Sequence, residues 1–180
     1  KKKKNAIIEV AKVLHIEMHC SRAYDRSVST LTLTGNRENT MTLQIETIPC
    51  LSDNYAYLAH DPDTGQTAAV DVPEAQPILE ILEERDWTLS HVLITHHHAD
   101  HVQGLDELLE NAHAKVIGAA ADAHRLPPLD IAVQEGDSII IGNATGHVIE
   151  VPGHTVGHIA FHFPESETVF SADSLMALGC

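Results

Sequence analysis

Cysteine, aromatic residues and long apolar runs are scarce in this sequence of 180 residues. The three cysteines, Cys20, Cys50 and Cys180, lie far apart and match no zinc-binding pattern, so the sequence predicts no disulfide framework. No apolar run approaches the roughly 18 to 20 residues that a membrane-spanning helix needs. These absences favour a cytoplasmic α/β protein that has no membrane partner.

Basic residues are also scarce, except at the start of the chain. Residues 1–40 hold 8 of the 11 Lys and Arg residues, whereas residues 41–180 hold 3 basic and 22 acidic residues. Because phosphate binding needs basic side chains, the acidic part predicts no nucleic-acid partner. Met41 has the character of a natural start. We therefore expect residues 1–40 to form a basic, poorly packed extension, and residues 41–180 to form one domain.

The segment 95–101, with the sequence THHHADH, carries the strongest functional signal. An apolar, β-branched run precedes it and apolar residues at helical spacing follow it, so it is predicted to join a strand to a helix. Side chains two apart in an extended chain point the same way, so His96 and His98 can bind one metal. Asp100 and His101 then lie together at the helix start. Imidazole and carboxylate are ligands of zinc, iron and manganese; the alternative is a solvated histidine-rich loop.

Two later segments hold further candidate ligands. His154 has a glycine close by on either side, which permits a tight turn that presents its imidazole. Asp173 is expected at the end of an apolar strand, where its two oxygens could bridge two cations. Taken alone, Asp173 could merely cap a turn, and His158 and His162 are better explained as hydrogen-bonded structural histidines.

Together these segments resemble the metallo-β-lactamase superfamily and, within it, the glyoxalase II (hydroxyacylglutathione hydrolase) family. The resemblance runs from about Met41 to Cys180, and the matching segments are residues 48–58, 95–101, 153–158 and 170–175, followed by Gly179 and Cys180. It implies an α/β fold of the αββα sandwich type. It also implies two divalent metal ions, for which zinc is the first choice and iron or manganese are alternatives.

The resemblance further implies a role for each candidate residue. It places His96, His98 and His154 on one cation, Asp100 and His101 on the second, and Asp173 between the two. Asp71, at a predicted strand end, matches a buried aspartate that supports the metal-binding loop, although a turn or helix-start residue is an equal alternative.

The implied reaction is hydrolysis of S-lactoylglutathione to D-lactate and glutathione by a metal-bound hydroxide, as in methylglyoxal detoxification. Asp100 would accept a hydrogen bond from that hydroxide and orient it. Three alternatives remain: a sulfur dioxygenase with a single iron, an RNase Z-like phosphodiesterase, and a metal-binding fragment without turnover.

Members of the glyoxalase II family continue beyond the Gly-Cys pair. There they have a basic residue that contacts glutathione, a later histidine that completes the second metal site, and a helical C-terminal domain. We therefore expect this chain to be an incomplete copy, with a sandwich that is incomplete at the C-terminus. One tightly bound metal and poor thioester hydrolysis are the expected consequences.

The coarse pattern along the domain alternates strands with helices. A helix is expected over residues 73–85 and a turn over residues 61–65. Strands are expected over residues 42–48, 55–60, 68–70, 90–94, 115–118, 138–141, 147–151, 158–163 and 168–171.

Overall fold

The computed structural model describes residues 43–175 of the chain. The expected basic extension, residues 1–40, and the final Gly179–Cys180 pair lie outside the described residues. The predicted domain boundary at Met41 therefore stays a prediction.

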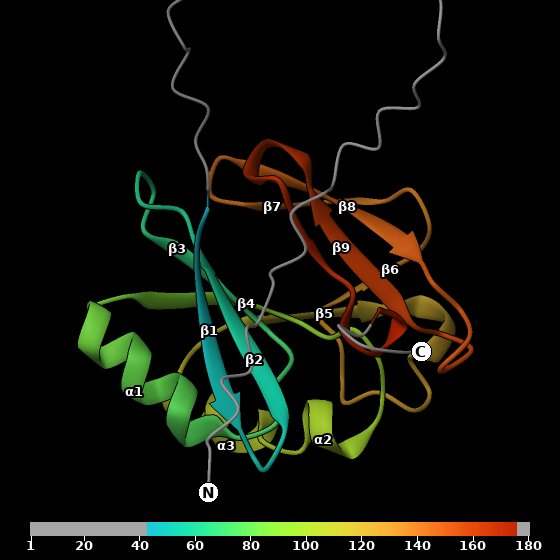
Figure 1. Cartoon of the computed structure of the whole chain (residues 1–180), viewed down its shortest axis with the longest axis horizontal. Helices are drawn as coiled ribbons and strands as arrows, with labels where there is room; N and C mark the ends of the chain where they lie inside the picture. Colours follow the sequence, from blue (N-terminus) through green and yellow to red (C-terminus); the bar gives the residue numbers. More distant parts are fainter. Residues whose placement is uncertain (1–42, 176–180) are drawn as a thin grey trace, which may run out of the picture.

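Two β-sheets face each other in the described part of the chain (Figure 1). The larger has, in spatial order, β1 (Gln44–Cys50), β2 (Asn54–His60), β3 (Gln66–Val70), β4 (Thr88–Leu93), β5 (Lys115–Ala119) and β6 (Ile131–Val133). The smaller has the order β10 (Thr168–Phe170), β9 (Ile159–Phe163), β8 (Ala144–Glu150) and β7 (Ser138–Ile141). Strands β1 to β3 pair antiparallel and β3 to β6 pair parallel, whereas the smaller sheet is antiparallel throughout.

Helices lie against the outer side of the larger sheet (Figure 1). The α-helices are α1 (Ala75–Arg85), α2 (Ala99–Val102) and α3 (Leu105–Asn111), and the short 3₁₀ helices are η1 (Ala120–Asp122), η2 (Pro164–Ser166) and η3 (Ala172–Ser174). Helix α1 makes the crossover between the parallel strands β3 and β4, and α2 and α3 lie between β4 and β5. Residues 43–175 thus supply one helical layer and the two facing sheets of the expected sandwich.

Alternation along the strands divides the buried residues between two cores. In β3, Ala68 and Val70 pack in the cluster between the two sheets, while Ala69 packs in the cluster between the larger sheet and the helices. This is the period of two that a strand buried on both faces requires. The inter-sheet core contains three phenylalanines, Phe161, Phe163 and Phe170, all from the smaller sheet.

The observed elements follow the expected pattern apart from the short 3₁₀ helices and two further differences. Strand β6 was not expected, because it is only three residues long and Ile131 and Ala132 are exposed, so it carries no hydrophobic alternation. The helical pattern after the histidine motif is also interrupted, between α2 and α3. Gly104 lies there against the start of α1, and a Cβ atom on it would lie 2.8 Å from the backbone nitrogen of Ala75.

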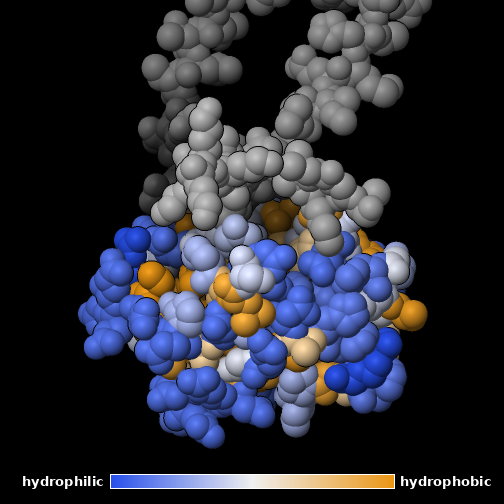
Figure 2. All heavy atoms as spheres, turned by 60° about the horizontal axis from the view of Figure 1, so that its bottom comes forward, coloured by the Kyte–Doolittle hydropathy of each residue, from blue (hydrophilic) through white to orange (hydrophobic). Residues whose placement is uncertain are grey.

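The end of the molecule that carries α2 and α3 is predominantly hydrophilic, with apolar residues in small separate groups (Figure 2). Among residues 43–175, no helix has the length and apolar character needed to cross a membrane.

Two neighbouring isoleucines test the placement of the inter-sheet core. Ile141 is fully buried between the sheets, whereas Ile140 is 62% exposed on the other face of the same strand. We expect Ile141→Ala to lower the free energy of unfolding by about 2 to 5 kcal/mol, because it leaves a cavity in the core. Ile140→Ala should change it by about 0.5 kcal/mol or less. Urea denaturation measures both, and equal losses would contradict the assigned facing of β7.

Candidate metal centre

The histidine motif lies at the carboxyl end of β4, where the chain leaves the larger sheet. Residues 94–98 follow β4 without helical structure, and His98 has extended backbone angles. Helix α2 then begins at Ala99, so Asp100 and His101 fall in its first turn. The strand therefore presents His96 and His98, and the helix start presents the next two candidate ligands.

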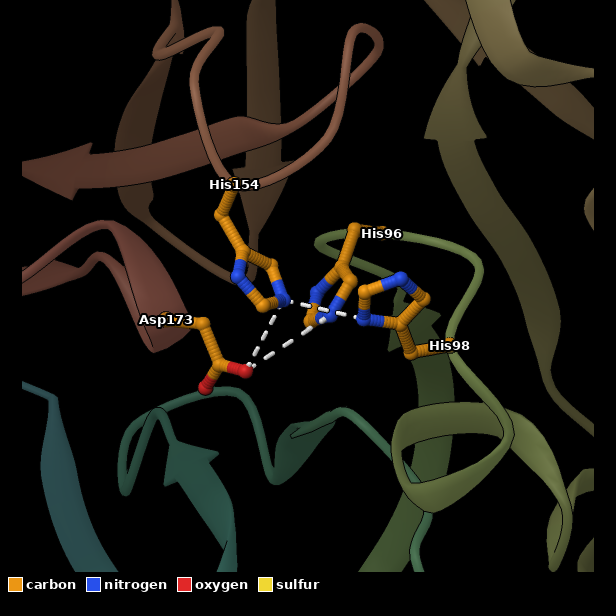
Figure 3. Close-up of side chains that lie close together, drawn as sticks. All are labelled: His96, His98, His154 and Asp173. Atoms are coloured by element: carbon orange, nitrogen blue, oxygen red, sulfur yellow. Dashed lines mark hydrogen bonds and ion pairs between the residues drawn. The ribbon is translucent and has the colours of Figure 1, made fainter.

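The smaller sheet brings two more side chains to the same place. His154 comes from the loop between β8 and β9, and Asp173 comes from η3, after β10. Figure 3 shows these two side chains pointing toward His96 and His98. Ligand atoms of the four residues all lie within 4.8 Å of one another. Residues far apart in the sequence thus converge on one point between the ends of the two sheets.

Asp173 lies between the two groups of candidate ligands. Its Oδ2 atom is 3.1 Å from Nε2 of His154 and 3.9 Å from Nε2 of His96, while its Oδ1 atom is 3.5 Å from Nε2 of His101. Asp173 was expected at a strand end, but β10 ends at Phe170 and the carboxylate follows in η3. The preceding Ala172 has a φ of 42°, in the left-handed region. The chain turns there with a backbone conformation that alanine rarely adopts.

Two buried imidazole nitrogens face this centre without a partner. Nε2 of His96 and Nε2 of His101 make no hydrogen bond within the described part of the chain. Burial, together with the neighbouring His101 and His158 rings, lowers the pKa of His96 to about 2. His96 is therefore neutral at physiological pH, with an unshared electron pair available. A buried polar atom left without a partner is costly, so these nitrogens point to an absent ligand.

A buried carboxylate orients His101 and the histidine motif. Asp71 accepts hydrogen bonds from the backbone N–H of Thr95 at 2.8 Å, from the Thr95 hydroxyl at 2.7 Å, and from Nδ1 of His101 at 2.8 Å. Burial opposes the charged form of His101, but the hydrogen bond and charge of Asp71 outweigh it and raise the pKa of His101. A proton on Nδ1 leaves Nε2 free to face the centre.

Asp71 itself lies in an unusual backbone conformation. Its φ is 56°, and it follows the last residue of β3. Aspartate tolerates the left-handed region better than most residues. Asp71 thus makes three hydrogen bonds to the histidine motif. The alternative was a residue at a turn or at the start of a helix, and α1 begins later, at Ala75.

Asp100 receives support from the hairpin between β1 and β2. The Asn54 side chain donates to Oδ2 of Asp100 at 2.9 Å and to its backbone oxygen at 3.3 Å. The first of these bonds is the main reason that the pKa of Asp100 lies below its ordinary value. Asp100 is therefore an ionised acceptor at neutral pH. Its Oδ2 atom lies 3.8 Å from Nε2 of His101.

His97 faces away from the centre, as the extended spacing predicts. Its Nδ1 atom donates to Oδ2 of Asp122 at 2.9 Å, and Arg125 donates to the other oxygen of that carboxylate. Burial opposes ionisation of Asp122, but these hydrogen bonds hold its pKa below the ordinary value. Gly157 packs directly on Asp122, since a Cβ there would lie 2.4 Å from the carboxylate carbon. A side chain at position 157 would collide with Asp122, so close packing, rather than turn flexibility, explains why this residue is glycine.

His158 links the His154 loop to η3. It is buried, its ring stacks on His96 at 4.5 Å, and its Nδ1 lies 3.1 Å from the Ser174 hydroxyl. That hydroxyl also donates to the backbone oxygen of Val151 at 3.3 Å. The position of Asp173, next to Ser174, is thereby tied to the loop that carries His154.

The structure brings all six predicted ligands and the supporting aspartate to one site. Sequence reasoning missed three residues that hold the site together: Asn54, Asp122 and Ser174. Each is a single polar residue in a loop or at an element end, without a periodic or spacing signal. Only the three-dimensional contacts identify them.

The sequence of residues 63–180 matches the metallo-beta-lactamase superfamily. The chain belongs to this superfamily. The match covers both the histidine motif and the segments that carry His154 and Asp173.

Curated relatives support the resemblance to glyoxalase II. The chain is 64% identical over 140 residues to a hydroxyacylglutathione hydrolase of Cereibacter sphaeroides, an alignment that covers 78% of this chain and 55% of the relative. It is also 64% identical over 137 residues to a protein of the same name from a Jannaschia species, covering 76% of this chain and 54% of the relative. The chain thus spans about half the length of the curated relatives it matches. The resemblance seen in the sequence is confirmed.

Solved structures confirm the metallo-β-lactamase fold. A crystal structure of the BLEG-1 B3 metallo-beta-lactamase matches with a TM-score of 0.68 at 21% identity, and the match covers 74% of this chain and 73% of that protein. At this identity the likeness concerns the fold alone.

The Asp71 carboxylate provides a test of how the centre is held together. We expect Asp71→Ala to lower the free energy of unfolding by about 3 kcal/mol or more, because buried donors on Thr95 and His101 lose their acceptor. Asp53→Ala, in the exposed β1–β2 hairpin tip, serves as the control and should change it by about 0.5 kcal/mol or less. Chemical denaturation of the chelator-treated proteins measures the difference. A loss no larger than that of the control would contradict the bracing role.

The buried histidines predict acid sensitivity of the metal-free chain. Burial lowers the pKa of His96 to about 2, and burial also lowers the pKa of His98 and His158. At these three histidines the unfolded chain binds more protons below the ordinary pKa of about 6.5, so their contribution to stability falls as the pH drops from there to about 5, whereas the raised pKa of His101 contributes in the opposite direction. His96 alone contributes a slope of up to about 1.4 kcal/mol per pH unit.

Urea denaturation in the presence of a chelator, repeated from pH 7 to 5, measures this slope. His96→Gln should reduce it, whereas the exposed control His147→Gln should leave it unchanged. An identical slope in parent and His96→Gln would refute the explanation.

Proposed function

We propose that this chain carries the metal centre of a hydroxyacylglutathione hydrolase, an enzyme that hydrolyses a glutathione thioester. The observation that carries the proposal is the convergence of His96, His98, His154 and Asp173, together with the buried, unpartnered Nε2 atoms of His96 and His101.

The donors fit divalent cations. Neutral imidazole and carboxylate suit zinc, iron and manganese, and zinc is the first choice for a nitrogen-rich set. His96, His98, His154 and Asp173 would hold one cation. His98 faces His154 through Nδ1, 2.9 Å from Nε2 of that ring. In this structure one of the two nitrogens can donate a hydrogen bond to the other, and each could instead offer an unshared electron pair to a cation between the rings.

A second cation would be held by Asp100, His101 and the other oxygen of Asp173. Asp173 supports this because its two oxygens face different histidines, His154 and His101. Within residues 43–175, the first set offers four side chains and the second set three. We therefore expect the first cation to bind more tightly.

Bound cations would lower the pKa of a coordinated water from about 15.7 toward about 7, which would make a nucleophile available at neutral pH. The chain supplies the rest of the chemistry. The ionised Asp100 carboxylate accepts a hydrogen bond from the attacking water and orients it toward the carbonyl carbon of the thioester. The buried rings of His96 and His101 exclude other water from one side. Because a thiolate is a good leaving group, the site needs no strong general acid.

The substrate class rests on the curated relatives, which are named hydroxyacylglutathione hydrolases. We propose S-lactoylglutathione as the substrate, with D-lactate and glutathione as products. The acidic composition of residues 41–180 gives no support to the phosphodiesterase alternative.

Removal of one ligand tests both the metal site and the reaction. We expect His154→Ala to weaken zinc binding by about 100-fold or more and to lower kcat/KM for S-lactoylglutathione by at least a similar factor, because the tighter cation loses one of four donors. Competition with a chromophoric chelator measures the affinity, and loss of thioester absorbance measures the rate. His147→Ala, an exposed histidine on β8, is the matched control and should match the parent in both assays. Unchanged zinc affinity in His154→Ala would overturn the assigned ligand set. A chain that binds zinc but gives no thioester hydrolysis, even when it is joined to the remaining C-terminal part of a curated relative, would overturn the proposed reaction.

A further inference from the structure

We propose that Asn54 is a positioning residue that fixes the Asp100 carboxylate for the second, weaker cation. This inference rests on the proposed function, since it concerns one of the two cation sites described there. It assigns a role to a side chain outside the histidine motif, 46 residues earlier in the sequence.

The contact is specific in its chemistry. One amide nitrogen of Asn54 donates to Oδ2 of Asp100 at 2.9 Å and to the backbone oxygen of the same residue at 3.3 Å. An amide NH₂ group carries two hydrogens, so one group can make both bonds. Because Asn54 binds both the backbone oxygen and the carboxylate of Asp100, it restricts the side-chain torsion angles of Asp100. Within residues 43–175, the hydrogen bonds of the Asn54 side chain go to Asp100 alone.

Asp100 needs such an external support. Its side chain is 49% exposed, and it belongs to a helix of only four residues. An exposed carboxylate on so short a helix can rotate into solvent, at a cost in ordering when it binds a cation. Asn54 holds Oδ2 3.8 Å from Nε2 of His101, a separation that allows both atoms to approach one cation. The support therefore pre-organises two of the three donors of the second set.

Asn54 is itself held in a fixed position. It is the first residue of β2 and pairs with the buried Cys50 at the end of β1. The intervening tip is fastened by a hydrogen bond from the backbone N–H of Leu51 to the Glu74 carboxylate, just before α1. Strand pairing and the hydrogen bond at the hairpin tip therefore hold Asn54 in place more accurately than a loop would.

The geometry also predicts which of the two cations binds more weakly when Asn54 is lost. Asp100 belongs to the second set alone, whereas His96, His98 and His154 belong to the first. Loss of Asn54 should therefore act on the weaker cation and spare the tighter one. A general structural role would weaken both.

A mutant cycle on the chain tests this with zinc as the probe. Zinc titration against a chromophoric chelator gives two affinities for each of the parent, Asn54→Ala, Asp100→Ala and the double variant. We expect Asn54→Ala to weaken the second zinc by about 10- to 100-fold and to change the first by less than about threefold. In the Asp100→Ala background, Asn54→Ala should add less than about twofold, because its target is gone. Ser52→Ala, on the same hairpin tip, is the matched control and should behave as the parent.

Asn54→Gln provides a second variant if the alanine protein does not fold. It keeps the amide but displaces it by one methylene, so the second zinc should still bind more weakly than in the parent. A second affinity unchanged in Asn54→Ala or Asn54→Gln would overturn the proposal, as would an equal loss from Asn54→Ala with and without Asp100. A parent that binds a single zinc would overturn this proposal and the two-cation site together. Two zincs and an Asn54 effect without thioester hydrolysis would overturn only the proposed reaction.

Discussion

The arrangement of the centre depends on one buried carboxylate. Asp71 follows β3, while the Thr95 donors and His101 follow the neighbouring strand β4, so the three hydrogen bonds join two adjacent strand ends. Because Asp71 adopts a left-handed conformation, its carboxylate reaches across to that segment. The backbone of the histidine motif is fixed in this way before any ligand binds. The remaining contacts adjust single side chains on that fixed segment.

Around this anchor, three of the six candidate ligands have a partner that orients their side chain. Asn54 orients Asp100 and Asp71 orients His101. The ring of His96 stacks on His158, and its Nδ1 donates to the Thr95 hydroxyl, whose own hydrogen goes to Asp71. Most of these partners are outside the conspicuous motif. Burial and the neighbouring imidazoles lower the pKa of His96, whereas the hydrogen bond and charge of Asp71 outweigh burial and raise the pKa of His101, so the two neighbouring histidines hold protons differently.

The sequence predicted the parts of the fold and site that follow from regular spacing. Alternation gave the strands, and the THHHADH spacing gave His96, His98, Asp100 and His101 together at a strand-to-helix junction. Strand β6 was missed because its exposed residues carry no alternation. The break at Gly104 was missed because it depends on the start of α1, about thirty residues away. Asn54 was missed for the same reason, since a single polar residue shows its partner only when the chain is folded.

The centre draws its ligands from both halves of the sandwich. His96 and His98 leave the larger sheet, whereas His154 and Asp173 leave the smaller one. At the opposite end, Asp61 accepts a hydrogen bond from the backbone N–H of Asn143 at 2.6 Å and joins the β2–β3 turn to the β7–β8 turn. A cation would thus act as a cross-link that closes a long loop of chain, much as a disulfide does. The backbone N–H of Ile159, at the start of β9, already donates to the backbone oxygen of Thr95 at 3.0 Å, so a cation would reinforce an existing link between the two sheets at the metal-binding end.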